Sequence, residues 1–340
     1  MTATSTPPTG PRPTAAPTGG VDPSEASRGA LAGLGAYAIW GLFPLYFHAL
    51  APAGAWEILG HRIAWTLVLC LAILLVRRDL SWVVPLLRRP RMLLGIAVAA
   101  ALIAVNWVVY VSAVVTGQVT EASLGYFLNP IVTVGLGVVV LGERLRRLQW
   151  VAVGVGCVAG VYLSVVGGRV PWIALTLAVS FALYGLTKKK LGASLQALHG
   201  LTVETVVLTP VALGVVGWLA VTGQQTFTSG APWHPALLVL SGVITAVPLL
   251  LFAEAARRVP LTTIGLLQFL TPVLQLLCGV WLLGEHMSGA RWLGFAVVWV
   301  ALALLSLDSL LNRPARLARR AGRRADTEPA AGSVVCEPAP

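Results

Sequence analysis

Three ionisable residues stand close together in one apolar stretch, and their side-chain types suit the binding of a proton and an anion. Glu57 and His61 are four residues apart, a spacing that places both on one face of a helix. A carboxylate beside an imidazole can hold a titrating proton, and the guanidinium of Arg62 can bind a carboxylate through two parallel hydrogen bonds. The alternative is that all three side chains reach water from the helix end.

Two further carboxylates lie in apolar stretches. Glu204 is a candidate for the same polar pathway or a gate, and its alternatives are an interfacial position or an ion pair with Lys188. Glu121 follows Thr120 at an expected helix start, where an acid favours the positive end of the helix and Thr120 can cap it. That structural interpretation is favoured, with a role at an outer gate as the alternative.

Neutral polar residues near the middle of the apolar stretches are a second group of candidates. They either bind a polar solute or tie one helix to another, and they are Asn106, Tyr110, Tyr126, Asn129 and Gln275. Prolines in such stretches remove backbone hydrogen bonds, and discontinuous helices often mark binding sites in membranes. The expected helix breaks are at Pro130, Pro248 and Pro272; gentle kinks without solute contact are the alternative.

The composition shows which solvent surrounds these residues. Of 340 residues, 57% are hydrophobic and only 11% are charged, whereas soluble proteins carry about 25% charged residues. Lipid must therefore cover much of the surface. The net charge of +11 comes from short basic runs between apolar stretches, so no nucleic-acid partner is expected. The four cysteines have no zinc or disulfide spacing, and neither a metal nor a cofactor is expected.

The apolar runs predict an all-α membrane protein with ten transmembrane helices, because a spanning helix needs about 20 apolar residues. The short loops between the runs contain Pro, Gly or charged residues, as turns do. The expected spans are 30–50, 56–76, 92–115, 120–141, 147–166, 170–188, 198–221, 236–256, 260–283 and 290–310.

Lysine and arginine predict the orientation, since cytoplasmic loops are enriched in both. With a cytoplasmic N-terminus, the outer loops hold only Arg169 and Arg291. Both termini are then cytoplasmic, in disordered tails at 1–28 and 313–340. The inner loops hold Arg77, Arg78, Arg88, Arg89, Arg91, Arg144, Arg146, Arg147, Lys188, Lys189, Lys190, Arg257 and Arg258.

An internal repeat is the strongest pattern in the chain. Phe127-Leu128-Asn129-Pro130 recurs as Phe269-Leu270-Thr271-Pro272, and Leu141-Gly142-Glu143 recurs as Leu283-Gly284-Glu285 at the same offset. The two repeats are 29–166 and 167–312. Each contains five helices, an odd number, so the second copy enters the membrane from the opposite side. Such inverted repeats are a recurring architecture of secondary transporters, because two similar halves can open one central site to either side.

Several runs resemble the RarD group of the EamA family, in the drug/metabolite transporter superfamily. They are Trp56–Arg62, Asn106-Trp107, Glu121–Pro130 and Leu141–Arg144. The resemblance covers roughly residues 30–310 and implies a central cavity lined by the first four helices of each repeat. It also implies peripheral fifth helices and transport of amino acids, metabolites or drugs, often outward. Gly60 departs from the pattern, because a larger residue is expected there.

The sequence therefore predicts a secondary active transporter in the cytoplasmic membrane that exports a small polar metabolite, amino acid or drug-like solute by alternating access. Protons are the candidate coupling ion, with Glu57, His61 and Glu204 as their sites. No Walker A pattern is present, so ATP hydrolysis by this chain is excluded. No HExxH or GxSxG motif occurs, so an enzyme is not expected. A channel or a non-transporting regulatory or binding protein is the alternative.

Overall fold

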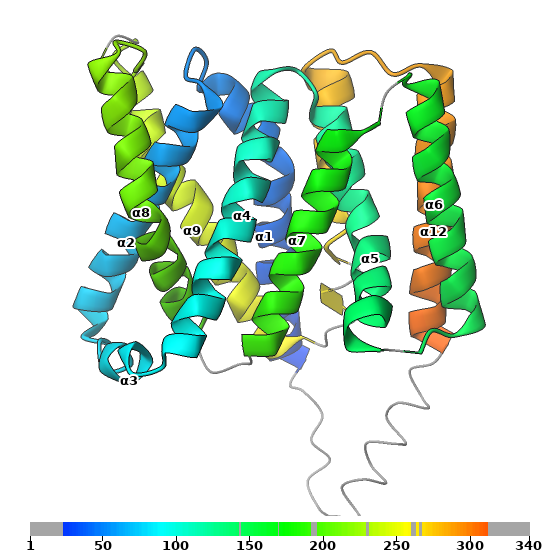
Figure 1. The fold of residues 1–340 in the computed structure, drawn as a ribbon, viewed down its shortest axis with the longest axis horizontal. Helices are drawn as coiled ribbons and strands as arrows, with labels where there is room; N and C mark the ends of the chain where they lie inside the picture. The colour runs from blue at the N-terminus through cyan, green and yellow to red at the C-terminus, as the bar shows by residue number, and fades with distance from the viewer. Residues whose placement is uncertain are drawn as a thin grey trace, which may run out of the picture.

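The fold is a bundle of membrane-length helices (Figure 1). The computed structural model describes residues 23–142, 144–168, 170–191, 196–228, 231–259, 263–264 and 267–311, and this part contains no strand. Eight of its helices are long and apolar enough to cross a membrane. They are α1 (Pro23–Ala49), α2 (Ala55–Arg77), α4 (Pro90–Val115), α5 (Val119–Leu141), α6 (Arg147–Val166), α8 (Ala197–Val221), α9 (His234–Arg258) and α12 (Gly289–Leu311).

Two further apolar segments have shorter helices. One is α7 (Trp172–Leu191), and the other is α11 (Leu270–Leu277), which continues as the π-helix η1 (Cys278–Leu282). A short helix, α3 (Val83–Leu87), lies at one end of the bundle. Every span expected from the sequence therefore contains a helix, and the all-α membrane fold is confirmed.

The three expected helix breaks have different outcomes. Pro272 lies in the first turn of α11, and a turn at Gln268–Phe269 comes directly before this helix. Proline lacks the backbone N–H and collides with the carbonyl four residues earlier. By contrast, α5 and α9 continue through Pro130 and Pro248. The expected breaks there are corrected to prolines inside continuous helices, which membrane helices tolerate when neighbouring groups satisfy the freed carbonyl.

The start of α1 is also earlier than expected. It begins at Pro23, so residues 23–28 of the expected tail are helical. Proline suits the first helical position, where no N–H is needed, and Glu25 in the first turn complements the helix dipole. Residues 1–22 and 312–340 lie outside the described residues, as do Arg169 and the repeated Glu143.

The two repeats pack against each other throughout the bundle. Helix α1 packs on α9, α2 on α8 and α9, and α4 and α5 on α7. The fifth helices, α6 and α12, pack mainly on each other at one side of the bundle (Figure 1). We call the end where α1 begins and α12 ends the terminal end, and the opposite end the far end. The central region is thus built from helices of both halves.

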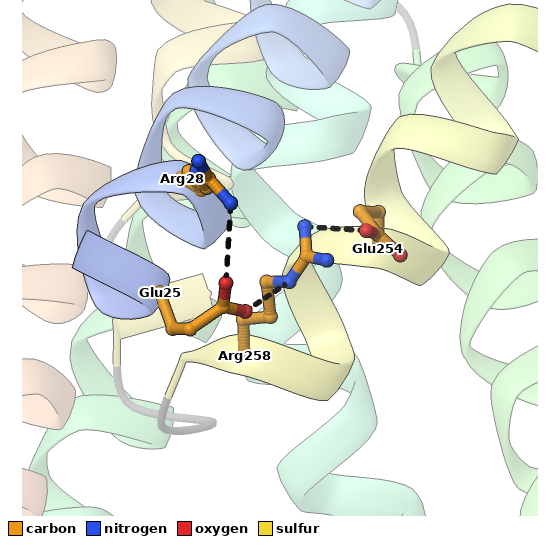
Figure 2. A network of polar contacts seen from close by, with 4 residues as sticks. All are labelled: Glu25, Arg28, Glu254 and Arg258. Carbon is orange, nitrogen blue, oxygen red and sulfur yellow. Dashed lines mark hydrogen bonds and ion pairs between the residues drawn. The ribbon is translucent and has the colours of Figure 1, made fainter. Parts of the chain in front are cut away.

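Ion pairs join helices at the terminal end. Figure 2 shows Glu25 of α1 between Arg28 and Arg258, with Arg258 Nε at 2.8 Å from Glu25 Oε2. Arg258 also pairs with Glu254. These side chains are about a third exposed or more, and such pairs contribute roughly 0–1 kcal/mol each. The network therefore links α1 to α9 only weakly.

A close backbone contact joins α2 to α9. A Cβ atom added at Gly242 would lie 2.4 Å from the carbonyl carbon of Trp65 and 2.7 Å from the nitrogen of Thr66. Real Cβ atoms do not approach backbone atoms so closely. Only glycine therefore allows this helix separation.

We expect Gly242→Ala to push α2 and α9 apart and to lower stability by about 1–3 kcal/mol, as overpacking does. The measurement is the melting temperature of the purified protein in detergent. Gly214→Ala in α8 is the matched control, because its Cβ would meet nothing within 4 Å. Equal melting temperatures for the two variants would contradict the close contact.

Candidate functional site

Arg62 lies inside the bundle rather than at its surface. It is seven residues beyond the start of α2, roughly 10 Å along the helix axis. Only 3% of the residue is exposed, and Glu57 and His61 are 2% and 9% exposed. The alternative in which all three side chains reach water is therefore wrong. The cause is tertiary, because α8, α9 and the loop between them cover this face of α2.

Aromatic rings surround the Arg62 guanidinium. Its central carbon is 4.2 Å from the centre of the Trp107 ring and 5.5 and 5.6 Å from those of Phe43 and Phe47. Its Nε donates a hydrogen bond of 2.7 Å to Thr245 Oγ1. Cation–π contacts stabilise a desolvated guanidinium by about 2 kcal/mol. Side chains of α1, α4 and α9 therefore surround the single cation that α2 carries.

The charge of Arg62 has no anionic partner among the described residues. Its Nη1 is buried without a hydrogen-bond partner, and the bond to Thr245 is the only one that its side chain makes in this part of the chain. A guanidinium has five N–H donors, and a buried unpaired ion costs several kcal/mol. The buried Nη1 is therefore a hydrogen-bond donor that the described residues leave unused.

Two more of the expected residues have buried polar atoms without a hydrogen-bond partner. The Tyr110 hydroxyl is buried without a partner, and its ring lies 6.0 Å from Phe47, which itself contacts Arg62. Gln275 donates through Nε2 to the Trp40 carbonyl at 3.2 Å, while its Oε1 has no partner. A donor and an acceptor are thus left unfilled on α4 and α11.

Other expected residues are already occupied by neighbouring helices. Asn106 Nδ2 donates to the Leu177 carbonyl at 3.0 Å and to Ser180 Oγ at 3.1 Å, and its Oδ1 accepts from the Tyr126 hydroxyl. The amide thereby ties α4 to α7 and α5. Asn129 accepts only a local bond from Thr133 at 3.4 Å. These contacts favour the helix-tying interpretation for Asn106 and Tyr126.

Glu204 pairs with Lys188 near the terminal end. Lys188 Nζ lies 2.7 Å from Glu204 Oε1, and the Tyr184 hydroxyl donates to Oε2 at 3.3 Å. The Glu204 side chain is 5% exposed, whereas that of Lys188 is 39% exposed. This is the ion pair that the sequence offered as an alternative, and it links α7 to α8.

Glu57 holds the loop between α8 and α9 at the far end. Its Oε1 accepts from the backbone N–H of Thr226 at 2.6 Å and of Phe227 at 3.2 Å, and its Oε2 accepts from Thr226 Oγ1 at 3.0 Å. Thr226 Oγ1 also shares a hydrogen bond of 2.7 Å with His234 Nε2. The ring of His61 stacks on Phe227, with centroids 4.9 Å apart. A carboxylate of one repeat therefore binds the backbone of the other.

Glu285 makes the reciprocal contact at the same end. Its carboxylate accepts from the backbone N–H groups of Val119 and Thr120, the second at 2.8 Å. It caps α5 in place of the expected Thr120, because no side chain within the helix satisfies these donors. Glu121 follows, beside a cavity of about 30 Å³. The repetition of Glu143 as Glu285 was the sequence signal for this contact.

Three polar residues of this architecture were not expected from the sequence. Thr226 lies in an ordinary polar loop, and nothing local shows that it meets Glu57; His234, at the start of α9, shares a hydrogen bond with Thr226. The side chain of Asp308 is 3% exposed and pairs with Arg146 at 2.7 Å. The contacts of Thr226 with Glu57 and of Asp308 with Arg146 join residues far apart in the sequence.

Comparisons with known proteins agree with the resemblance in the sequence. A protein named RarD from Streptomyces exfoliatus is 49% identical over 316 residues, which cover 93% of this chain and 98% of that protein. The uncharacterized transporter YojE of Bacillus subtilis is 40% identical over 291 residues, covering 84% and 96%. A crystal structure with 20% identity covers 82% of this chain and 97% of its own, with a TM-score of 0.52; it shows the fold alone.

The model of the EamA-like transporter family matches the chain twice, at residues 27–166 and 170–307. The two matches together span most of the chain. They fall on the two halves that the internal repeat relates. The protein therefore belongs to the EamA-like transporter family and is similar to proteins named RarD.

Proposed function

We propose that this multi-pass membrane transporter is a secondary active exporter of a small polar metabolite, amino acid or drug-like solute, working by alternating access. The observation that carries the proposal is the buried, unpaired Arg62, which contacts side chains of both repeats. A purely structural bundle gains nothing from a desolvated cation without a counter-charge. In a transporter, the bound solute supplies the counter-charge that the protein lacks.

Contacts between the repeats close both ends of the bundle. At the far end, Glu57 and Glu285 accept charge-assisted hydrogen bonds from backbone N–H groups, each worth about 1.5–3 kcal/mol. At the terminal end, Glu25 pairs with Arg258 and the buried Asp308 pairs with Arg146 at 2.7 Å. Alternating access requires these two sets of contacts to break in turn.

The distribution of arginine supports a cytoplasmic terminal end. Arg77, Arg89 and Arg146 stand at helix ends on that side, whereas Arg291 follows the start of α12 at the far end. This bias follows the positive-inside rule. Protonation of Glu57 would remove the charge that holds the far end closed, so Glu57, with His61 and Glu204, is the candidate site of proton coupling.

Export predicts a solute whose distribution depends on the protein. We expect overexpression to raise the level of at least one small solute in the medium and deletion of the gene to raise its level in cells. Glu57→Gln and Glu204→Gln should abolish the difference, whereas Glu254→Gln, in the partly exposed network of Figure 2, should retain it. Untargeted metabolite profiling of cells and medium measures this.

The same cells distinguish a transporter from its alternatives. Flux that rises linearly with solute concentration would indicate a channel rather than a saturable carrier. No protein-dependent solute in either rich or minimal medium would contradict transport and favour a regulatory or binding protein.

The far-end contacts predict reciprocal effects on backbone exchange. Replacing a carboxylate by an amide removes the charge from the acceptor, so Glu57→Gln should speed hydrogen exchange at Thr226 and Phe227 about tenfold. It should leave Val119 and Thr120 unchanged. Glu285→Gln should do the reverse, and each variant is the matched control of the other. Hydrogen–deuterium exchange in nanodiscs checks this, and a change at both sites in both variants would show general loosening instead.

A further inference from the structure

We infer that the solute bound at the centre is an organic monoanion whose carboxylate is held by Arg62. This inference rests on the proposed function and adds the chemical class of the solute. It follows from three features of the surroundings of Arg62. They are the donors left free on the guanidinium, the absence of a second buried Lys or Arg among the described residues, and the aromatic rings around the cation.

The free donors lie where a carboxylate binds. The Trp107 ring lies 4.2 Å from the central carbon of the Arg62 guanidinium, and an aromatic ring supplies no hydrogen-bond acceptor atom that would replace a carboxylate. Thr245 occupies Nε, and the buried Nη1 is unpartnered. Two parallel hydrogen bonds to a carboxylate are the arrangement that this group favours.

The carboxylate that is nearest to Arg62 in the sequence does not pair with it. Glu57 precedes it on α2, but both Glu57 oxygens accept hydrogen bonds from Thr226, and Oε1 accepts another from Phe227. No ion pair joins Glu57 to Arg62 among the described contacts. The positive charge is therefore kept for a partner that the folded chain does not itself supply.

The amount of charge favours a carboxylate over a phosphate. Arg62 is the only Lys or Arg classed as buried in the described part of the chain. Lys188 is already paired with Glu204. A phosphate monoester carries about −1.5 to −2 charges at neutral pH, which one guanidinium does not balance. A monocarboxylate matches the single charge.

The aromatic residues around Arg62 suit a solute with an apolar group next to its carboxylate. Phe43, Phe47 and Trp107 surround the cation. The unpartnered hydroxyl of Tyr110, whose ring is 6.0 Å from that of Phe47, is a second donor for a carboxylate oxygen. The expected solute therefore combines one carboxylate with an aliphatic or aromatic group.

Direct binding to purified protein in nanodiscs tests the inference without requiring transport. The probes are acids and their neutral amides, matched in shape: lactate and lactamide, phenylacetate and phenylacetamide, and indole-3-acetate and its amide, with phenyl phosphate added. Isothermal titration measures each affinity. We expect at least one acid to bind roughly tenfold or more tightly than its amide, the scale of a charge-assisted hydrogen bond, and more tightly than phenyl phosphate.

Variants test whether Arg62 and Tyr110 cause the preference for the acid over the amide. Arg62→Gln should reduce the acid-over-amide ratio to about one, and Arg62→Lys should keep only part of it, because lysine retains the charge but not the fork. Tyr110→Phe removes a single oxygen and should weaken acid binding severalfold without affecting the fold. Arg291→Gln, near the far-end start of α12, should bind as the wild type does.

The outcomes separate this inference from the proposed function. Acid preference that depends on Arg62, without any flux in proteoliposomes, would support the carboxylate site and reject transport. Amides that bind as tightly as every acid, a preference that persists in Arg62→Gln, or tighter binding of phenyl phosphate would overturn the carboxylate site. Saturable flux of a neutral solute by the same preparation would then leave the transporter proposal standing.

Discussion

The unpaired charge of Arg62 is the constraint on which the arrangement of the centre depends. A guanidinium in a bundle surrounded by lipid is stable only if the protein replaces its hydration. Here three rings and one threonine hydroxyl do so in part. The chain stops short of full compensation, since Nη1 remains unfilled. That unused donor is the observation on which the proposed carboxylate site rests.

Several other buried polar groups have partners on neighbouring helices. Asn106 uses both ends of its amide to join three helices, and Asp308 is paired with Arg146. Glu57 and Glu285 each bind backbone N–H groups of the other repeat at the far end. Their carboxylates fix how the halves meet at the far end, and the pair of Asp308 with Arg146 joins the halves at the terminal end.

The spans could be predicted because lipid imposes a simple rule on the sequence. A helix that crosses a bilayer needs a long apolar run, and each expected run contains a helix. The prolines were harder to interpret than the spans. Pro272 lies in the first turn of a helix that follows a turn, but Pro130 and Pro248 lie within continuous helices. A proline therefore marks a possible break, and its surroundings decide whether the break forms.

The sequence by itself determined the membrane class, the repeat and the family, because composition, apolar run length and repeated motifs are properties of the linear chain. It also identified the polar residues inside the spans. Only the tertiary structure decided which of them have partners, since the partner of Glu57 lies 169 residues away and that of Arg62 lies 183 residues away. No local pattern encodes such pairs. Whether a buried polar atom is satisfied or free for a solute depends on how the two halves pack.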